Sequence, residues 1–178
     1  FHEKTFLMTY DYDNNEVSIK KLKNSDTSQD TYKRAMLLLY YPWFPQDDGE
    51  AMALLKTLAE KGHVASQYEY GLYLYREQID PAEAVKWLSL ASQYGLTRAQ
   101  YRLAKILQDS PWVVNDEKKA LFWYELAATE THFFSMLKSA ELKLLANDKN
   151  LRNQPEAIDI LKNIDEKQHN NPDYHCLR

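Results

Sequence analysis

The chain has 178 residues, of which 44% are hydrophobic, and its 22 Lys and Arg against 26 Asp and Glu give a formal net charge of −4. The hydrophobic share is sufficient for a buried core, yet no window reaches the roughly 18 consecutive apolar residues of a membrane-spanning helix. The acidic balance argues against a nucleic-acid-binding protein, which usually carries a basic face. A single cysteine excludes an intramolecular disulfide.

The N-terminal residues 1–27 are expected to form an extension or a helical cap. Two candidate elements, Thr5–Tyr12 and Glu16–Leu22, flank Asp13–Asn15, a sequence that also fits the turn of a β-hairpin. The chain begins at Phe1 and not at methionine, which suggests processing or trimming at this end.

Residues 28–165 show helical spacing of apolar residues and predict about four helical hairpins. Asp80 followed by Pro81 is typical of a helix start, and Gly62 and Gly95 are typical of helix ends. Residues 166–178 form a polar C-terminal tail. The expected helices span residues 30–41, 49–60, 64–75, 81–93, 97–108, 116–129, 133–145 and 155–164.

An internal repeat runs through these helices. Ala51 and Gly62 recur 33 residues later as Ala84 and Gly95, and Ala120–Ala128 repeats the start of that unit 36 residues further on. A period of this length indicates stacked helical hairpins, none of which can bury its apolar face alone. The predicted fold class is all-α, a right-handed α/α superhelix (solenoid) of helical hairpin repeats.

Small residues at repeated positions predict close helix crossings, because only small side chains let helix backbones approach closely. Tryptophans at equivalent places are expected to fill the space between neighbouring hairpins. The small residues are Ser66, Gly71, Ala91, Ala104 and Ala127, and the tryptophans are Trp87 and Trp123.

The pattern AxxWLxxASxxGxxxAQYxLA, preceded by DPAEA or DEKKA, resembles the Sel-one-like repeat (SLR), a relative of the tetratricopeptide repeat. The resemblance covers about Tyr32–Ile164, and the spacing varies from 33 to 37 residues, whereas the tetratricopeptide period is a constant 34. Thr131 stands where the glycine between hairpins is expected, and Glu141 stands where a small residue is expected. The last hairpin is therefore expected to pack differently.

The resemblance implies a non-enzymatic protein–protein interaction scaffold or adaptor, such as those of bacterial envelope assembly, and so favours a periplasmic or secreted location. Two alternatives stay open: a cell-wall or carbohydrate-binding module, and the regulatory repeat region of a larger enzyme complex. No cofactor is predicted.

No catalytic or metal-binding motif stands out: the nucleophile elbow, the phosphate-binding glycine loop and the H-E-x-x-H pattern are all missing. His63 and His132 follow the turns between hairpins and are predicted to have a structural or solvated role. His169, His175 and Cys176 match no zinc spacing.

A partner-binding groove is predicted by analogy with tetratricopeptide proteins, on an alignment that makes Ala35, Tyr70, Leu103 and Ala140 equivalent. Cations gathered on one face of an acidic protein suggest an acidic or carboxylate-bearing peptide or protein partner, although solvated helix faces would give the same pattern. The predicted groove residues are Lys33, Arg34, Tyr68, Glu69, Leu72, Tyr101, Arg102, Lys105 and Lys138.

The last hairpin is expected to leave an apolar flank around Ile158, Leu161 and Ile164. Either a capping segment beyond Asp165 or self-association through this end would cover it.

Overall fold

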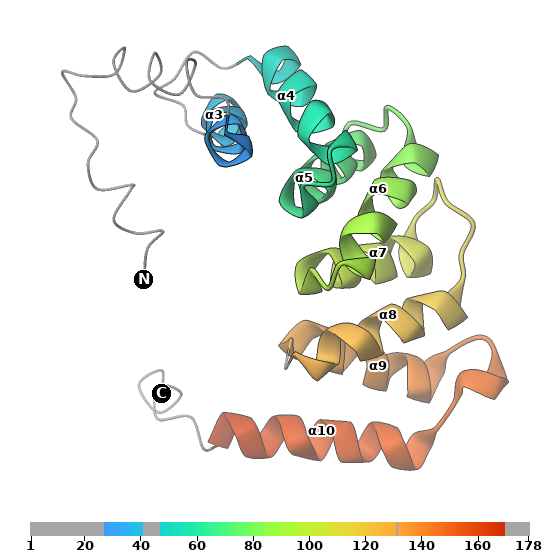
Figure 1. The fold of residues 1–178 in the computed structure, drawn as a ribbon. Coiled ribbons are helices and arrows are strands. Elements are labelled where there is room, and N and C mark those ends of the chain that lie inside the picture. Colours follow the sequence, from blue (N-terminus) through green and yellow to red (C-terminus); the bar gives the residue numbers. More distant parts are fainter. Residues whose placement is uncertain (1–26, 41–46, 131, 170–178) are drawn as a thin grey trace. The chain divides into compact units, whose positions relative to one another are not determined.

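The computed structural model describes residues 27–40, 47–130 and 132–169, with side chains up to Asp165. Regular structure in these residues is helical throughout, without strands, so the all-α prediction is confirmed (Figure 1). The elements are α3 (Ser28–Tyr40), α4 (Asp48–Glu60), α5 (Val64–Arg76), α6 (Pro81–Gln93), α7 (Thr97–Asp109), α8 (Glu117–Thr129), α9 (Phe133–Leu145), the 3-10 helix η1 (Lys149–Leu151) and α10 (Gln154–His169).

The predicted boundaries agree with these elements to within a few residues, except at the C-terminus. There α10 continues to His169, beyond the expected end at Ile164. The predictions for residues 1–26 and for the end of the tail lie outside the described residues. None of the described helices combines the length and the apolarity that crossing a bilayer requires.

The chain divides into two compact units, residues 1–70 and 71–178, and the boundary falls inside α5. In the first unit α3 packs against α4, and the buried side chains include Ala35, Ala51, Leu55 and Leu58. An ion pair between Arg34 and Glu50 also joins these two helices.

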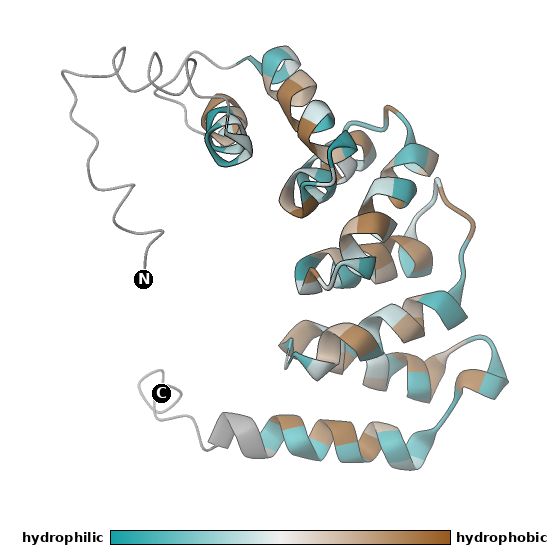
Figure 2. Cartoon of the chain, viewed as in Figure 1, coloured by the Kyte–Doolittle hydropathy of each residue, from teal (hydrophilic) through white to brown (hydrophobic). Residues whose placement is uncertain are grey.

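In the second unit each helix from α6 to α10 packs against the next one along the chain (Figure 1). Leu88, Leu103, Tyr124 and Ala127 are fully or almost fully buried at the centre of this stack. Hydrophobic and hydrophilic residues alternate along its helices, as expected for helices that each cover a neighbour (Figure 2).

Capping residues set the helix ends at the positions that the sequence predicts. The Asp80 carboxylate accepts the Glu83 backbone N–H at 2.9 Å, and Pro81 occupies the first turn of α6. Gly62 and Gly95, at the ends of α4 and α6, have φ of 86° and 83°, a conformation that residues with a Cβ adopt at a cost.

A buried glutamine links the end of one hairpin to the start of the next. The Gln67 side-chain amide donates to the Ala59 carbonyl at 3.2 Å, and the Gln100 amide donates to the Ser92 carbonyl at 3.1 Å. Both carbonyls lie in the last turn of a helix and also accept the backbone N–H of Gly62 or Gly95, so each amide adds a second hydrogen bond at a helix end. The repeated Gln of the SQY and AQY motifs is therefore a structural residue.

The structure corrects the alignment of the odd-numbered helices by one residue. The helices α3, α5, α7 and α9 each have 13 residues, and their eighth residues are all small: Ala35, Gly71, Ala104 and Ala140. Ala35 and Ala140 are thus equivalent to Gly71 and Ala104, and their alignment with Tyr70 and Leu103 was wrong.

The small residues are required by close helix contact. A Cβ added at Gly71 would lie 3.1 Å from Leu88 Cγ and 3.2 Å from the Ala84 carbonyl oxygen. In α9 this position belongs to the buried Ala140, so the expectation that Glu141 replaces the small residue was also wrong. Thr131 lies outside the described residues.

Candidate partner-binding site

The second unit contains an open pocket of about 400 Å³ lined by the C-terminal half of α5 and by α7. Helical spacing explains its lining, because residues three and four apart in a helix share a face. The lining residues are Leu72, Tyr75 and Arg76 of α5, then Arg102, Lys105, Ile106 and Asp109 of α7, and Ser110.

The α7 helix has two faces with different roles. Its inner face buries Leu103, Ala104 and Leu107, which fixes the rotation of the helix. Arg102 and Lys105 therefore point outward, and both are exposed, as their predicted role requires. The rotation of α7 is thus set by the core, while the chemistry of the pocket is set by its outer residues.

Positive charge predominates in this pocket. Among the described residues, neither Arg102 nor Lys105 takes part in an ion pair, and Arg76 lies 4.0 Å from the exposed carboxylate of Glu77. Asp109 is the acidic group that lines the same pocket. Against the carboxylates of Asp109 and Glu77, the three cations leave a local excess of one positive charge on a chain of net charge −4.

The predicted groove residues of the first unit are largely occupied by intramolecular contacts. Lys33 pairs with Asp30 at 3.6 Å, and Arg34 pairs with Glu50. Tyr68 and Glu69 are buried, and the Glu69 carboxylate accepts a hydrogen bond from the Tyr40 hydroxyl at 3.2 Å. These four side chains offer little free polar surface to a partner.

In the second unit the structure brings Leu72, Arg102 and Lys105 into one pocket. Lys138 of α9 pairs instead with Glu141 at 2.7 Å. This hydrogen bond is the main cause of the raised pKa of Lys138.

Other pocket residues were missed in the sequence analysis. Tyr75 and Arg76 follow Leu72 by three and four residues, and Ile106 and Asp109 follow Arg102 by four and seven. Helical spacing from the predicted residues would have found them.

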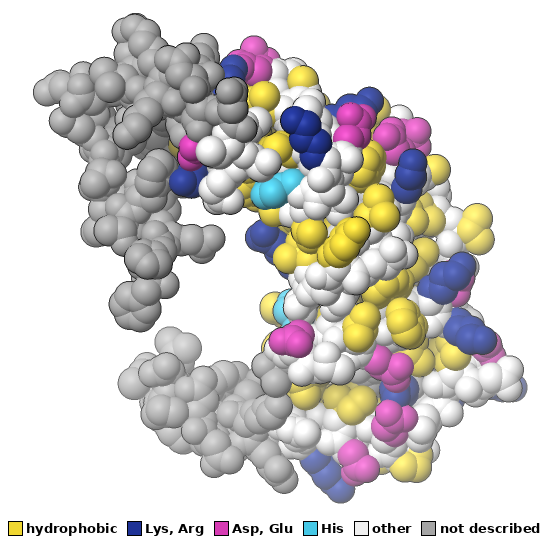
Figure 3. All heavy atoms as spheres, viewed as in Figure 1, with side chains coloured by type: hydrophobic (Ala, Val, Ile, Leu, Met, Phe, Trp, Pro, Cys, Tyr) yellow, Lys and Arg dark blue, Asp and Glu magenta, His cyan; other side chains and the backbone are white. Residues whose placement is uncertain are grey.

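Tyr101 belongs to a neighbouring aromatic cluster. Its ring centroid lies 5.0 Å from that of His132, 5.9 Å from Tyr124 and 6.3 Å from Phe134. Figure 3 shows that hydrophobic side chains reach the surface of the second unit between charged groups.

Of the two roles predicted for the histidines between hairpins, structural or solvated, the hydrogen bonds of both indicate the structural one. His132 Nδ1 accepts the Ser135 backbone N–H at the start of α9, and His63 contacts Ser66 in the same way. Burial lowers the pKa of each imidazole below its ordinary value. A lowered pKa favours the neutral imidazole, which is the form that can accept this hydrogen bond.

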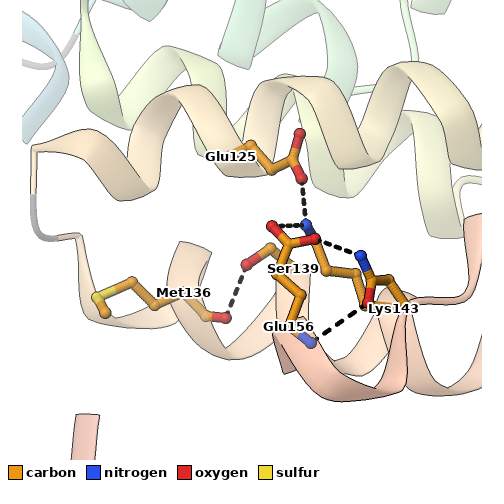
Figure 4. A network of polar contacts seen from close by, with 6 residues as sticks. Glu125, Met136, Ser139, Lys143 and Glu156 are labelled. Atoms are coloured by element: carbon orange, nitrogen blue, oxygen red, sulfur yellow. Dashed lines mark hydrogen bonds and ion pairs between the residues drawn. The ribbon is translucent and has the colours of Figure 1, made fainter. Parts of the chain in front are cut away.

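A buried lysine joins three helices of the second unit (Figure 4). Lys143 Nζ of α9 lies 2.6 Å from Glu125 of α8 and 2.5 Å from Glu156 of α10. Burial opposes the charged form of this lysine, but the two carboxylates outweigh burial and raise the pKa of Lys143. Its charge is therefore held by structural ion pairs, and this group is not poised for acid–base chemistry.

Over the residues with described structure, no three His, Cys, Asp or Glu side chains are grouped so as to hold a metal ion. His175 and Cys176 lie outside those residues.

Helical hairpins that repeat the same capping residues define an α-helical repeat protein. The Sel1 repeat matches this chain three times, at residues 32–63, 64–95 and 97–132, which together exceed half of its length. The chain therefore belongs to the Sel1 repeat family. Proteins of this family are generally protein-interaction scaffolds and are typically non-catalytic. The third match ends at residue 132, immediately before α9, so the hairpin of α9 and α10 lies outside the matched residues.

Two solved structures share the fold. One is c5321, a protective antigen present in uropathogenic Escherichia coli strains that displays an SLR fold, with a TM-score of 0.71 and 18% identity over 87% of this chain. The other is a Sel1 repeat protein from Oxalobacter formigenes, with a TM-score of 0.68 and 22% identity over 84% of this chain. The matched regions span 34% and 63% of those two chains, respectively. No curated protein matches.

Proposed function

We propose that this protein is a non-enzymatic interaction scaffold that binds an acidic or carboxylate-bearing segment of a partner protein in the pocket lined by α5 and α7. The observation that carries this proposal is the pair Arg102 and Lys105: both are exposed, line the pocket and make no ion pair among the described residues. Unpaired cations beside an apolar wall are arranged to receive a ligand carboxylate.

Ion pairs with Arg102 and Lys105 would not by themselves account for a high binding affinity. An exposed ion pair contributes about 0.2–1 kcal/mol, so two of them give specificity and faster association and not high affinity alone. The partly exposed Leu72 supplies apolar surface next to the cations, whereas Ile106 lines the pocket but is almost fully buried. Contacts with this wall would provide the remaining affinity.

A role in bacterial envelope assembly, in the periplasm or outside the cell, is a finer proposal that rests on the family resemblance. A carbohydrate-binding module is the second candidate, because Trp112 and Phe134 are exposed aromatic side chains. The charged character of the α5–α7 pocket favours a peptide ligand over a glycan, because Arg102 and Lys105 complement a carboxylate and not the uncharged hydroxyl groups of a neutral sugar.

Self-association through α10 belongs to the same proposal. Ile158 is 41% exposed and Leu161 is 38% exposed, as predicted, whereas Ile164 is buried. The equivalent residues of α8, Leu121 and Tyr124, are buried. The outer face of α10 therefore exposes apolar side chains whose equivalents in α8 are buried.

The pocket is tested with a phage-displayed peptide library selected on the full chain. We expect selected peptides to be rich in Asp and Glu, and to bind Arg102→Glu/Lys105→Glu at least about fivefold more weakly, as measured by fluorescence anisotropy. The control Lys56→Glu/Lys118→Glu makes the same charge change at two exposed lysines that do not line the pocket. Equal losses in both double variants, or selected peptides without acidic residues, would contradict the proposal.

A further inference from the structure

The connection between α7 and α8 is longer than its counterpart in the preceding repeat. Seven residues, Ser110–Asp116, join α7 to α8, whereas four, Glu77–Asp80, join α5 to α6. The longer connection carries Trp112, which is 49% exposed, and Val114, which is 88% exposed. In Figure 2 this connection includes a hydrophobic stretch that lies outside the helical stack. Insertions in repeat proteins often lie on the binding face.

This connection is held in place by hydrogen bonds to the end of α7. The Trp112 backbone N–H donates to Ser110 Oγ at 3.1 Å, and the Asp116 N–H donates to the Leu107 carbonyl at 2.8 Å. The Asn115 side-chain amide also donates to the Gln108 carbonyl. An exposed tryptophan on an anchored segment is preorganised for contact, because little conformational entropy is lost on binding.

Trp112 adjoins the pocket of the proposed function. Its ring meets that of Tyr75 edge to face, with the ring centroids 5.7 Å apart and an interplanar angle of 72°. Tyr75 and Ser110, which Trp112 contacts, both line the pocket. An apolar aromatic surface thus lies beside the cations Arg102 and Lys105.

We propose that the segment Ser110–Asp116 forms the apolar half of this binding site, and that the ligand is a peptide segment combining an acidic residue with a bulky apolar one. The carboxylate pairs with Arg102 and Lys105, and the apolar side chain packs on Trp112 and Tyr75. This inference rests on the proposed function and specifies the ligand that the pocket selects. Aromatic residues supply large contact areas at binding sites, which makes Trp112 the dominant apolar contact.

An array of synthetic peptides tests the two halves separately. Each peptide carries Glu or Gln at one fixed position. A single Phe or Ala occupies one of the four positions on either side of it, so that the array samples each spacing in turn. For the wild-type chain we expect the Glu and Phe combination to bind most tightly at one preferred spacing. Trp112→Ala should weaken that peptide about tenfold and leave the Glu and Ala peptide unchanged. Arg102→Glu/Lys105→Glu should remove the preference for Glu over Gln.

Phe122→Ala is the matched control, because Phe122 is an exposed aromatic residue of α8 that does not line the pocket. Circular dichroism and thermal melting verify that each variant is folded. The inference is overturned if Trp112→Ala binds the Glu and Phe peptide as tightly as wild type does, or if this variant weakens the binding of every peptide equally. The preference of the pocket for Glu over Gln would then remain without an apolar half of the site. If the wild-type chain does not distinguish Glu from Gln, or binds no peptide, the proposed function fails as well.

Discussion

His132 caps α9 through Ser135: the imidazole Nδ1 lies 2.8 Å from Ser135 Oγ and accepts the Ser135 backbone N–H at 3.3 Å. The first unit repeats this arrangement with His63 and Ser66 at the same two distances. A tyrosine ring lies 5.0 Å from each imidazole, Tyr101 in one case and Tyr32 in the other. Tyrosine, histidine and serine thus form a capping unit at the starts of α5 and α9, whereas Leu96 at the start of α7 makes no side-chain cap.

This capping unit predicts a loss of stability in acid. Burial lowers the pKa of His63 and His132 below 6.5, so the folded state favours the neutral imidazole. The resulting stabilisation is fully present above the unfolded pKa and is lost as the pH falls through the folded pKa. Protonation also removes the acceptor and places a positive charge at a helix N-terminus.

Thermal melts between about pH 7.5 and pH 5 measure this effect. His63→Asn/His132→Asn should show a smaller fall in melting temperature than wild type, because asparagine caps helices well and does not titrate. An identical fall in melting temperature in both proteins would show that the histidines do not cause it.

Gly71→Leu should destabilise the protein by about 1–3 kcal/mol or more, because even a Cβ at this position would lie 3.1 Å from Leu88 and Trp87 side chains. Ala82→Leu, at an exposed position of α6, is the control. Chemical denaturation measures both variants, and equal stability of Gly71→Leu and wild type would show that the close crossing is absent.

Removing Lys143 and removing its two carboxylate partners are expected to change the free energy of unfolding differently. Lys143→Leu should be nearly neutral or stabilising, because it removes the buried charge and leaves two half-exposed carboxylates in contact with water. Leucine is also the residue at the equivalent positions Leu74 and Leu107.

Glu125→Gln/Glu156→Gln should instead cost about 1–3 kcal/mol, because it leaves a buried ammonium without a countercharge. Urea denaturation near neutral pH compares the two changes. The reverse order of stabilities would show that the ion pairs contribute more than the burial of Lys143 costs.

The exposed face of α10 predicts concentration-dependent self-association. Ile158→Asp/Leu161→Asp should reduce it by placing charges on the apolar contact, with little effect on folding since both side chains are partly exposed. Light scattering over a range of protein concentrations measures the change. A wild-type chain that stays monomeric throughout that range would refute this prediction.

Much of the fold follows from short stretches of sequence. Asp80 with Pro81 starts α6 and Gly95 ends it, because caps depend on hydrogen bonds and backbone angles within a few residues. The 33-residue offset between Gly62 and Gly95 likewise indicates the hairpin repeat from the sequence alone. The exposure of Arg102 and Lys105 was also predictable, since both lie opposite the buried face of α7.

The tertiary structure decided what periodicity leaves open. Periodicity could not show that Tyr68 and Glu69 are buried, nor that Lys143 finds two carboxylates from other helices. Nor could it bring Trp112 against Tyr75, because this contact depends on how the connection after α7 is held. Local hydrogen bonds encode where a helix begins and ends, whereas the burial and partners of a side chain depend on neighbouring helices that are distant in the sequence.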